Sequence, residues 1–180
     1  MKTVLESIQE YTSKAVTEEI MKILERKIGD TRAGERMLEL STAIGPIKSV
    51  LGYGQEGICV LGQTGMVYKI YYSTVPLSVS MLAAACATGY VPKTLPVVSK
   101  INDWCISREN YKTKTQRCRD WVKGVRGYHK EKKIVSAEMK QWCEDANYEL
   151  SEIGAPPLYQ ADIKLDNFGE RKGKIVLLDF

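Results

Sequence analysis

Apolar residues near the start of the chain recur every three or four positions between charged residues, which is the spacing of an amphipathic helix. The first such pattern runs from residue 2 to about 28 and stops at Gly29. A second continues to about Ala43, and we expect Thr31 to cap its start. Residues 1–45 therefore predict an N-terminal helical extension, interpreted as a structural brace or, alternatively, as a partner-binding element.

The pattern changes at residue 47 to short apolar or alternating segments separated by glycine-rich turns, which is typical of antiparallel strands. An alanine-rich segment at 76–88 predicts one short helix after the third strand. The five expected strands are 47–51, 57–61, 66–72, 95–101 and 104–107. Residues 46–110 are thus predicted to form a five-stranded antiparallel sheet plus one helix.

The second half begins with a strongly basic stretch, 112–133, in which only Asp120 and Glu131 are acidic. It is either a solvated helix and loop or a docking surface for an anionic partner. A long amphipathic helix is expected at 135–153, followed by a loop and a hairpin. Residues 111–180 would form a reduced helical domain, which makes the chain α+β.

Composition agrees with a soluble globular protein, since 44% of residues are hydrophobic and 27% are charged. The net charge of +4 permits an anionic partner such as nucleotide phosphates or an acidic protein, without requiring nucleic acid. Five cysteines without a CxxC pair and a single His129 make a zinc site unlikely by spacing and indicate reduced thiols, as in a cytosol. We expect a cytoplasmic protein, because the cysteine count is odd and the charged N-terminus lacks the apolar region of a signal peptide. No apolar run is long enough to span a bilayer.

Polar residues near the end of the sequence form a set suited to phosphoryl transfer. Asp162 is followed by Lys164 two residues on and Asn167 five residues on, and an apolar strand then presents Asp179. A carboxylate can accept the proton of an attacking hydroxyl, while an amide oxygen and a second carboxylate can hold Mg²⁺. Asp162 would be the base, Lys164 would steady the phosphoryl group, and Asn167 and Asp179 would be metal ligands.

This segment resembles the catalytic loop and the Asp-Phe-Gly strand of the protein-kinase superfamily. A second match lies upstream, where Gly52, Gly54 and Gly57 fit the spacing G-x-G-x-x-G between two predicted strands. Glycines alone often only make turns, but here a strand follows, and the next strand carries Lys69 much as the family's Val-Ala-Ile-Lys strand does. The resemblance covers about 47–180.

The resemblance implies an ATP site with Mg²⁺ as its metal. Glycine backbone amides would close over the phosphates, and Lys69 would contact the α and β phosphates as part of the catalytic set. Cys59 stands where the family places a small apolar residue over adenine, and backbone groups from Ser107 to Glu109 would bind the adenine edge.

Three departures from the family pattern affect the expected activity. No Asp or Glu occurs from Ile70 to Asn102, so Lys69 lacks the family's helix glutamate. Gln160-Ala161 replaces the usual His-Arg, which removes the receptor for a phosphorylated activation loop. The family's later segments do not occur before Phe180, so we expect apolar faces that the N-terminal helices, a partner or a second copy would cover.

Two functions from different classes follow. The first is an ATP- and Mg²⁺-dependent kinase that phosphorylates Ser or Thr hydroxyls of itself or of a partner protein. The alternative is a kinase-fold binding module, a pseudokinase or an inhibitor of a host or partner protein, with little turnover. A small-molecule phosphotransferase ranks below both. The organisation resembles kinase-like proteins of bacteriophages, including the T7 type, which would place the protein in a host cytoplasm.

Overall fold

A computed structural model describes residues 14–76, 78–92, 94–96, 101–123, 137–154 and 165–178. The chain is α+β and divides into two compact units. The first comprises Met1–Leu77 with Thr94–Asn110, and the second comprises Ser78–Lys93 with Tyr111–Phe180. No helix in these described ranges is both long enough and apolar enough to cross a bilayer.

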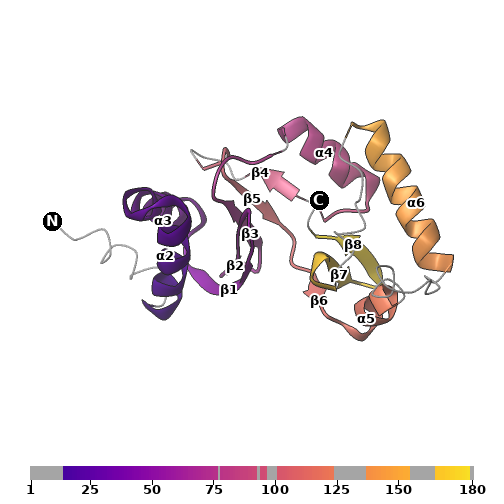
Figure 1. Ribbon diagram of the computed structural model, residues 1–180, viewed down its shortest axis with the longest axis horizontal. Helices are drawn as coiled ribbons and strands as arrows, with labels where there is room; N and C mark the ends of the chain where they lie inside the picture. Colours follow the sequence, from indigo (N-terminus) through magenta and orange to yellow (C-terminus); the bar gives the residue numbers. More distant parts are fainter. Residues whose placement is uncertain are drawn as a thin grey trace. The chain divides into compact units, whose positions relative to one another are not determined.

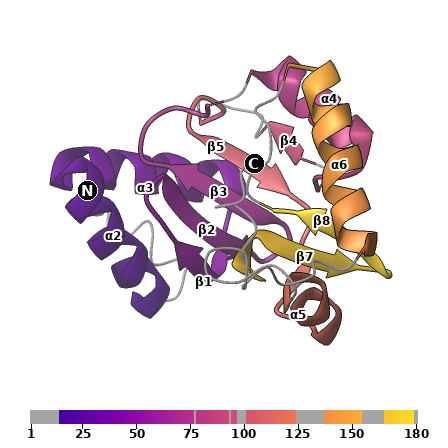
Figure 2. The same ribbon diagram turned by 45° about the vertical axis from the view of Figure 1, so that its right-hand side comes forward.

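The first unit is built on a five-stranded sheet in the order β1-β2-β3-β5-β4, with every neighbouring pair antiparallel (Figure 2). This confirms the predicted five-stranded antiparallel sheet, although the strand ends differ from those expected. Gly65, at φ 82°, occupies the turn between β2 and β3, where a left-handed backbone is required. The strands are β1 (Ile47–Tyr53), β2 (Gly57–Gly62), β3 (Val67–Tyr71), β4 (Thr94–Pro96) and β5 (Cys105–Arg108).

Helices α2 (Lys14–Ile28) and α3 (Asp30–Ile44) cover one face of this sheet (Figure 1). Their buried side chains form one core with those of the strands, so the helices are part of the sheet unit and not a separate extension. Thr31 does not cap α3, and that prediction is wrong. The helix already starts at Asp30, and Gly29 occupies the cap position with φ 81° and without a side-chain hydrogen bond.

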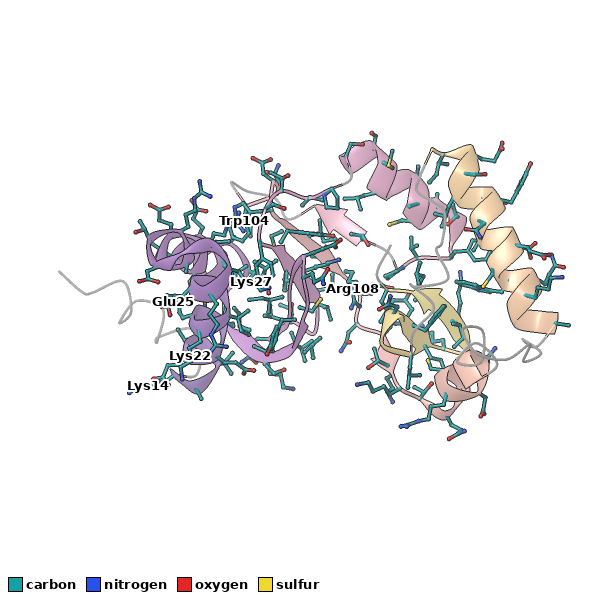
Figure 3. All side chains as sticks on the ribbon, viewed as in Figure 1. Lys14, Lys22, Glu25, Lys27, Trp104 and Arg108 are labelled. Carbon is teal, nitrogen blue, oxygen red and sulfur yellow. The ribbon has the colours of Figure 1, made fainter. Side chains whose placement is uncertain are left out.

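The Arg36 side chain links α3 to the sheet by hydrogen bonds and a cation–π contact. Its guanidinium donates to the carbonyl of Tyr71 and, over 3.1 Å, to that of Ser73. The same group lies 4.9 Å from the ring centroid of Trp104, which Figure 3 labels on the side of the sheet that the helices cover. One side chain thus joins the end of β3 to the residue preceding β5.

The second unit contains a three-stranded sheet in the order β6-β7-β8, and its final hairpin confirms the predicted ending. The long amphipathic helix is also present, whereas the two-residue strand β6 was not predicted. Its elements are β6 (Lys112–Thr113), α5 (Gln116–Lys123), α6 (Ala137–Glu152), the 3-10 turn η2 (Leu165–Asn167), β7 (Phe168–Arg171) and β8 (Lys174–Leu177).

The helix inserted after β3 lies in the second unit and not with the sheet where we expected it. This helix, α4 (Val79–Thr88), packs on α6 through a small buried cluster of Ala85, Val91 and Leu150. Ser78 caps its start by accepting the Met81 N–H over 3.2 Å. In the first unit, α2 and α3 provide the cover that one side of the sheet needs.

Candidate functional site

The candidate site is the face of the first unit's sheet that α2 and α3 do not cover. Cys59, Lys69 and Ile106 lie side by side on neighbouring strands, in register across β2, β3 and β5. Their strand neighbours Ile58 and Ile70 belong to the core under the helices. Because side chains alternate along a strand, Lys69 and Cys59 lie on the opposite face.

Lys69 reaches from this face to the connection between β1 and β2. Its ammonium Nζ lies 3.4 Å from the Glu56 carboxylate and 4.7 Å from the ring centroid of Tyr71. The Lys69 side chain is 13% exposed and that of Glu56 is 67% exposed. A shielded cation is therefore directed at the turn that contains the glycine pattern, and an exposed carboxylate lies beside it.

Glu56 was not predicted as a partner of Lys69, because the family pattern places the acidic partner on the inserted helix. The signal was the hairpin register. Because Cys59 pairs with Lys69, Gly57 pairs with Tyr71 two residues away. Glu56 directly precedes Gly57 and therefore lies at the open end of the hairpin, near Lys69. Glu56 is fixed there, since its carbonyl accepts the Tyr72 N–H over 2.8 Å.

The fold requires glycine at only one of the three glycine positions of the pattern. A Cβ on Gly57 would lie 2.2 Å from the Ile70 carbonyl oxygen, so close packing of β2 on β3 requires glycine there. At Gly52 and Gly54 an added Cβ would meet nothing within 4 Å, and neither residue has a positive φ. The fold therefore does not require glycine at these two positions, whereas a ligand that approaches the backbone closely would.

The residues expected around adenine occupy different parts of β2 and β5. Cys59 is partly buried on the Lys69 face. Ser107 lies inside β5, in register with Tyr68 on one side and Leu95 on the other, whereas Glu109 follows the strand's last residue. Adenine binding at Ser107 to Glu109 stays a prediction.

Cys105 has a structural role in the core of the first unit. Cys105 is fully buried on the helix-covered side, and its burial raises the pKa of its thiol to about 12. It therefore stays protonated at neutral pH and serves as a small apolar core residue.

In the second unit, Asn167 ends η2 immediately before β7. Its carbonyl accepts the N–H of Leu178 over 2.6 Å, and Leu178 directly precedes Asp179 in the sequence. Asp162, Lys164 and Asp179 lie outside the described residues. Within the described ranges no group of three or more His, Cys, Asp or Glu side chains could hold a metal ion, so the predicted magnesium ligands stay a prediction.

The chain was compared with known proteins by family and by sequence. No protein-family model matches it, and no curated protein does.

Proposed function

We propose that this protein binds ATP with Mg²⁺ in a kinase-like manner and transfers the terminal phosphoryl group to Ser or Thr hydroxyls of itself or of a partner protein. The observation that supports this most is the position of the Lys69 ammonium, 3.4 Å from a side chain of the glycine turn. A Cβ added at Gly52, near the end of β1, or at Gly54, just after it, would meet nothing within 4 Å, and the Gly54 N–H donates to the Gly57 carbonyl over 2.9 Å. A shielded cation beside a glycine-containing hairpin end without side-chain obstruction is a suitable setting for phosphates.

The proposed reaction uses Lys69 together with the candidate residues near the end of the sequence. The substrate hydroxyl gives its proton to Asp162, its oxygen forms a bond to the terminal phosphorus, and the bond from that phosphorus to the leaving ADP oxygen breaks. Lys164 steadies the phosphoryl group during this transfer. Asn167 and Asp179 would hold Mg²⁺, which would neutralise phosphate charge when bound.

Incubation with radiolabelled ATP and Mg²⁺ tests phosphoryl transfer. We expect the parent protein to label itself or added lysate proteins, and Asp162→Asn and Asp179→Ala to abolish labelling. ATP with Mg²⁺ at about 100 times its dissociation constant should stabilise the parent by roughly 2.7 kcal/mol, visible as a raised melting temperature. Absence of both labelling and stabilisation would exclude this function.

A binding module without turnover is the second candidate, and one observation favours it. The helix that follows β3 contains no acidic residue and packs on α6, so it offers Lys69 no carboxylate. Phosphoryl transfer depends on positioning, and a lysine whose carboxylate partner is an exposed glutamate is less well positioned than one paired with a helix glutamate. Stabilisation by ATP without any labelling would support this candidate over the enzyme.

Removal of the Glu56 charge should tighten nucleotide binding. The Glu56 carboxylate occupies the side of Lys69 that a phosphate would approach, and an exposed ion pair contributes only about 0–1 kcal/mol, so exchange costs little. We expect Glu56→Gln to lower the dissociation constant of ATP by roughly two- to fivefold. The gain should decrease from ATP to ADP to AMP in calorimetry, because it depends on phosphate charge.

Glu35→Gln, the same change at an exposed glutamate on α3, serves as the control and should leave ATP binding unchanged. If Glu56→Gln instead weakened ATP binding, Glu56 would be holding Lys69 in place for the nucleotide and not competing with it.

A further inference from the structure

Exposed basic side chains gather around the β7–β8 hairpin of the second unit. Among the described side chains, seven basic ones lie from β6 through α5 and on the hairpin, against the two acidic residues Asp120 and Glu170, while the whole chain has a net charge of only +4. Both acids accept a hydrogen bond nearby, Glu170 from Thr115 over 2.6 Å and Asp120 from Gln116 over 2.8 Å. This basic hairpin surface consists of Lys112, Lys114, Arg117, Arg119, Arg171, Lys172 and Lys174.

Two of these lysines have an unusual backbone. Lys114 has φ 56° and Lys172 has φ 50°, and no other non-glycine residue of the described chain has a positive φ. A left-handed conformation is costly for a side chain like lysine, and asparagine or glycine is preferred in such turns. Lysine at both positions carries this local backbone cost, and a positive φ at a non-glycine residue is a reason to look for a function there.

Three of the basic residues meet at the hairpin turn. Lys172 and Gly173 form the two-residue turn between Arg171 and Lys174. Arg117 of α5 has Nη1 at 3.6 Å from where a Cβ of Gly173 would sit, and Figure 2 shows α5 beside the hairpin. Lys112 is in register with Glu170 of the neighbouring strand, and Glu170 lies two residues before Lys172 in the sequence.

Two other members of the surface have structural roles that explain them without a ligand. Arg171 lies over the Tyr111 ring at 6.0 Å. Lys174 has its ammonium next to Gly89 at the carboxyl end of α4, where a cation is favoured by the helix dipole. Lys112 stands opposite Glu170 in a cross-strand pair of opposite charges, whereas Arg117 and Lys172 have no such explanation in the described structure.

We propose that the basic hairpin surface binds an acidic segment of a protein, and that in the proposed reaction this segment lies next to the phosphorylated Ser or Thr. The second statement rests on the proposed function. Lys172 follows Asn167 by five residues along β7, which is roughly 17 Å in an extended strand. An extended substrate would therefore place its acidic residues about four to six positions from the acceptor hydroxyl.

Nucleic acid is the less suitable partner. Surfaces for single strands combine positive charge with exposed aromatic side chains for stacking, and here Tyr111 is covered by the Arg171 guanidinium.

Fluorescence anisotropy without nucleotide tests the surface independently of phosphoryl transfer. The probe is a labelled peptide with a central Ser and Glu residues about four to six positions away on each side. A matched peptide with Gln in place of Glu and an oligothymidylate of equal length are the comparisons. We expect the Glu peptide to bind most tightly and its affinity to fall as salt increases.

Lys172→Asn separates charge from folding, because Asn-Gly is the preferred sequence for this turn. We expect this variant to have a higher urea midpoint than the parent and yet to bind the Glu peptide more weakly. Combined neutralisation, Lys112→Gln with Arg117→Gln and Lys172→Asn, should weaken binding at least about tenfold. Lys22→Gln on α2, an exposed lysine of the other unit, should leave binding unchanged.

Equal binding of the Glu and Gln peptides, tighter binding of the oligothymidylate, or full binding by the triple variant would each overturn the proposal. If the parent protein failed to bind the Glu peptide but was stabilised by ATP, the docking proposal would be overturned and the proposed function would remain. Peptide binding with no labelling by ATP would reject the reaction and keep the docking surface.

Discussion

Gly57→Ala is expected to destabilise the first unit by about 3 kcal/mol or more. The new methyl carbon would lie 2.2 Å from the Ile70 carbonyl oxygen and 3.1 Å from the Tyr71 Cα, so it would meet only backbone atoms. Those atoms belong to the central strand β3, which pairs with β2 and β5, and they cannot rotate away as a side chain would. Urea denaturation followed by circular dichroism measures the loss.

Gly52→Ala and Gly54→Ala are matched controls on the same turn. Their methyl groups would meet nothing within 4 Å, so stability should change by no more than about 0.5 kcal/mol. If the proposed function is correct, both variants should nevertheless bind ATP more weakly, because the methyl group stands between backbone and phosphates. Unchanged ATP affinity in both variants would mean that these glycines are only turn residues.

Phe168→Ala is expected to destabilise the second unit by about 3–5 kcal/mol. Phe168 is fully buried at the start of β7, in register with Leu177, and its ring lies 5.7 Å from that of Trp142 on α6. Removal of the ring would leave a cavity between the hairpin and α6. It would also loosen Asn167, the adjacent residue, so, if the proposed function is correct, ATP- and Mg²⁺-dependent labelling should fall as well.

Tyr148→Ala on α6 removes a ring of similar size that is 64% exposed, and it should change the free energy of unfolding by no more than about 0.5 kcal/mol. Equal effects of Phe168→Ala and Tyr148→Ala in urea denaturation would contradict the packing described here.

The sheet could be predicted because each strand carries its own local signal. Alternating apolar residues mark β2 and β3, and Gly65 marks the turn between them. The final hairpin was found in the same way from two short strands flanking a glycine turn. Strand β6 has only two residues and forms because it pairs with Glu170 and Gly169, so no local sequence pattern predicts it.

Packing partners were harder to predict than elements. The helix α4 is apolar and alanine-rich, and such a sequence does not specify which face packs or against what. Whether it lay with the sheet or against Leu150 therefore depended on residues far away in the chain. Glu56 was missed for a related reason, since its nearness to Lys69 follows from strand register and not from the spacing of a motif.

The order in which the two units share the chain has a consequence for synthesis on the ribosome. The segment carrying α4 is inserted between β3 and β4, yet its partner residue Leu150 is translated later. At a translation rate of about 5–20 residues per second, Leu150 is synthesised roughly 3 to 13 seconds after Ala85. During that interval the nascent chain exposes an apolar helix without its packing partner, so α4 is a segment that a ribosome-associated chaperone would be expected to bind.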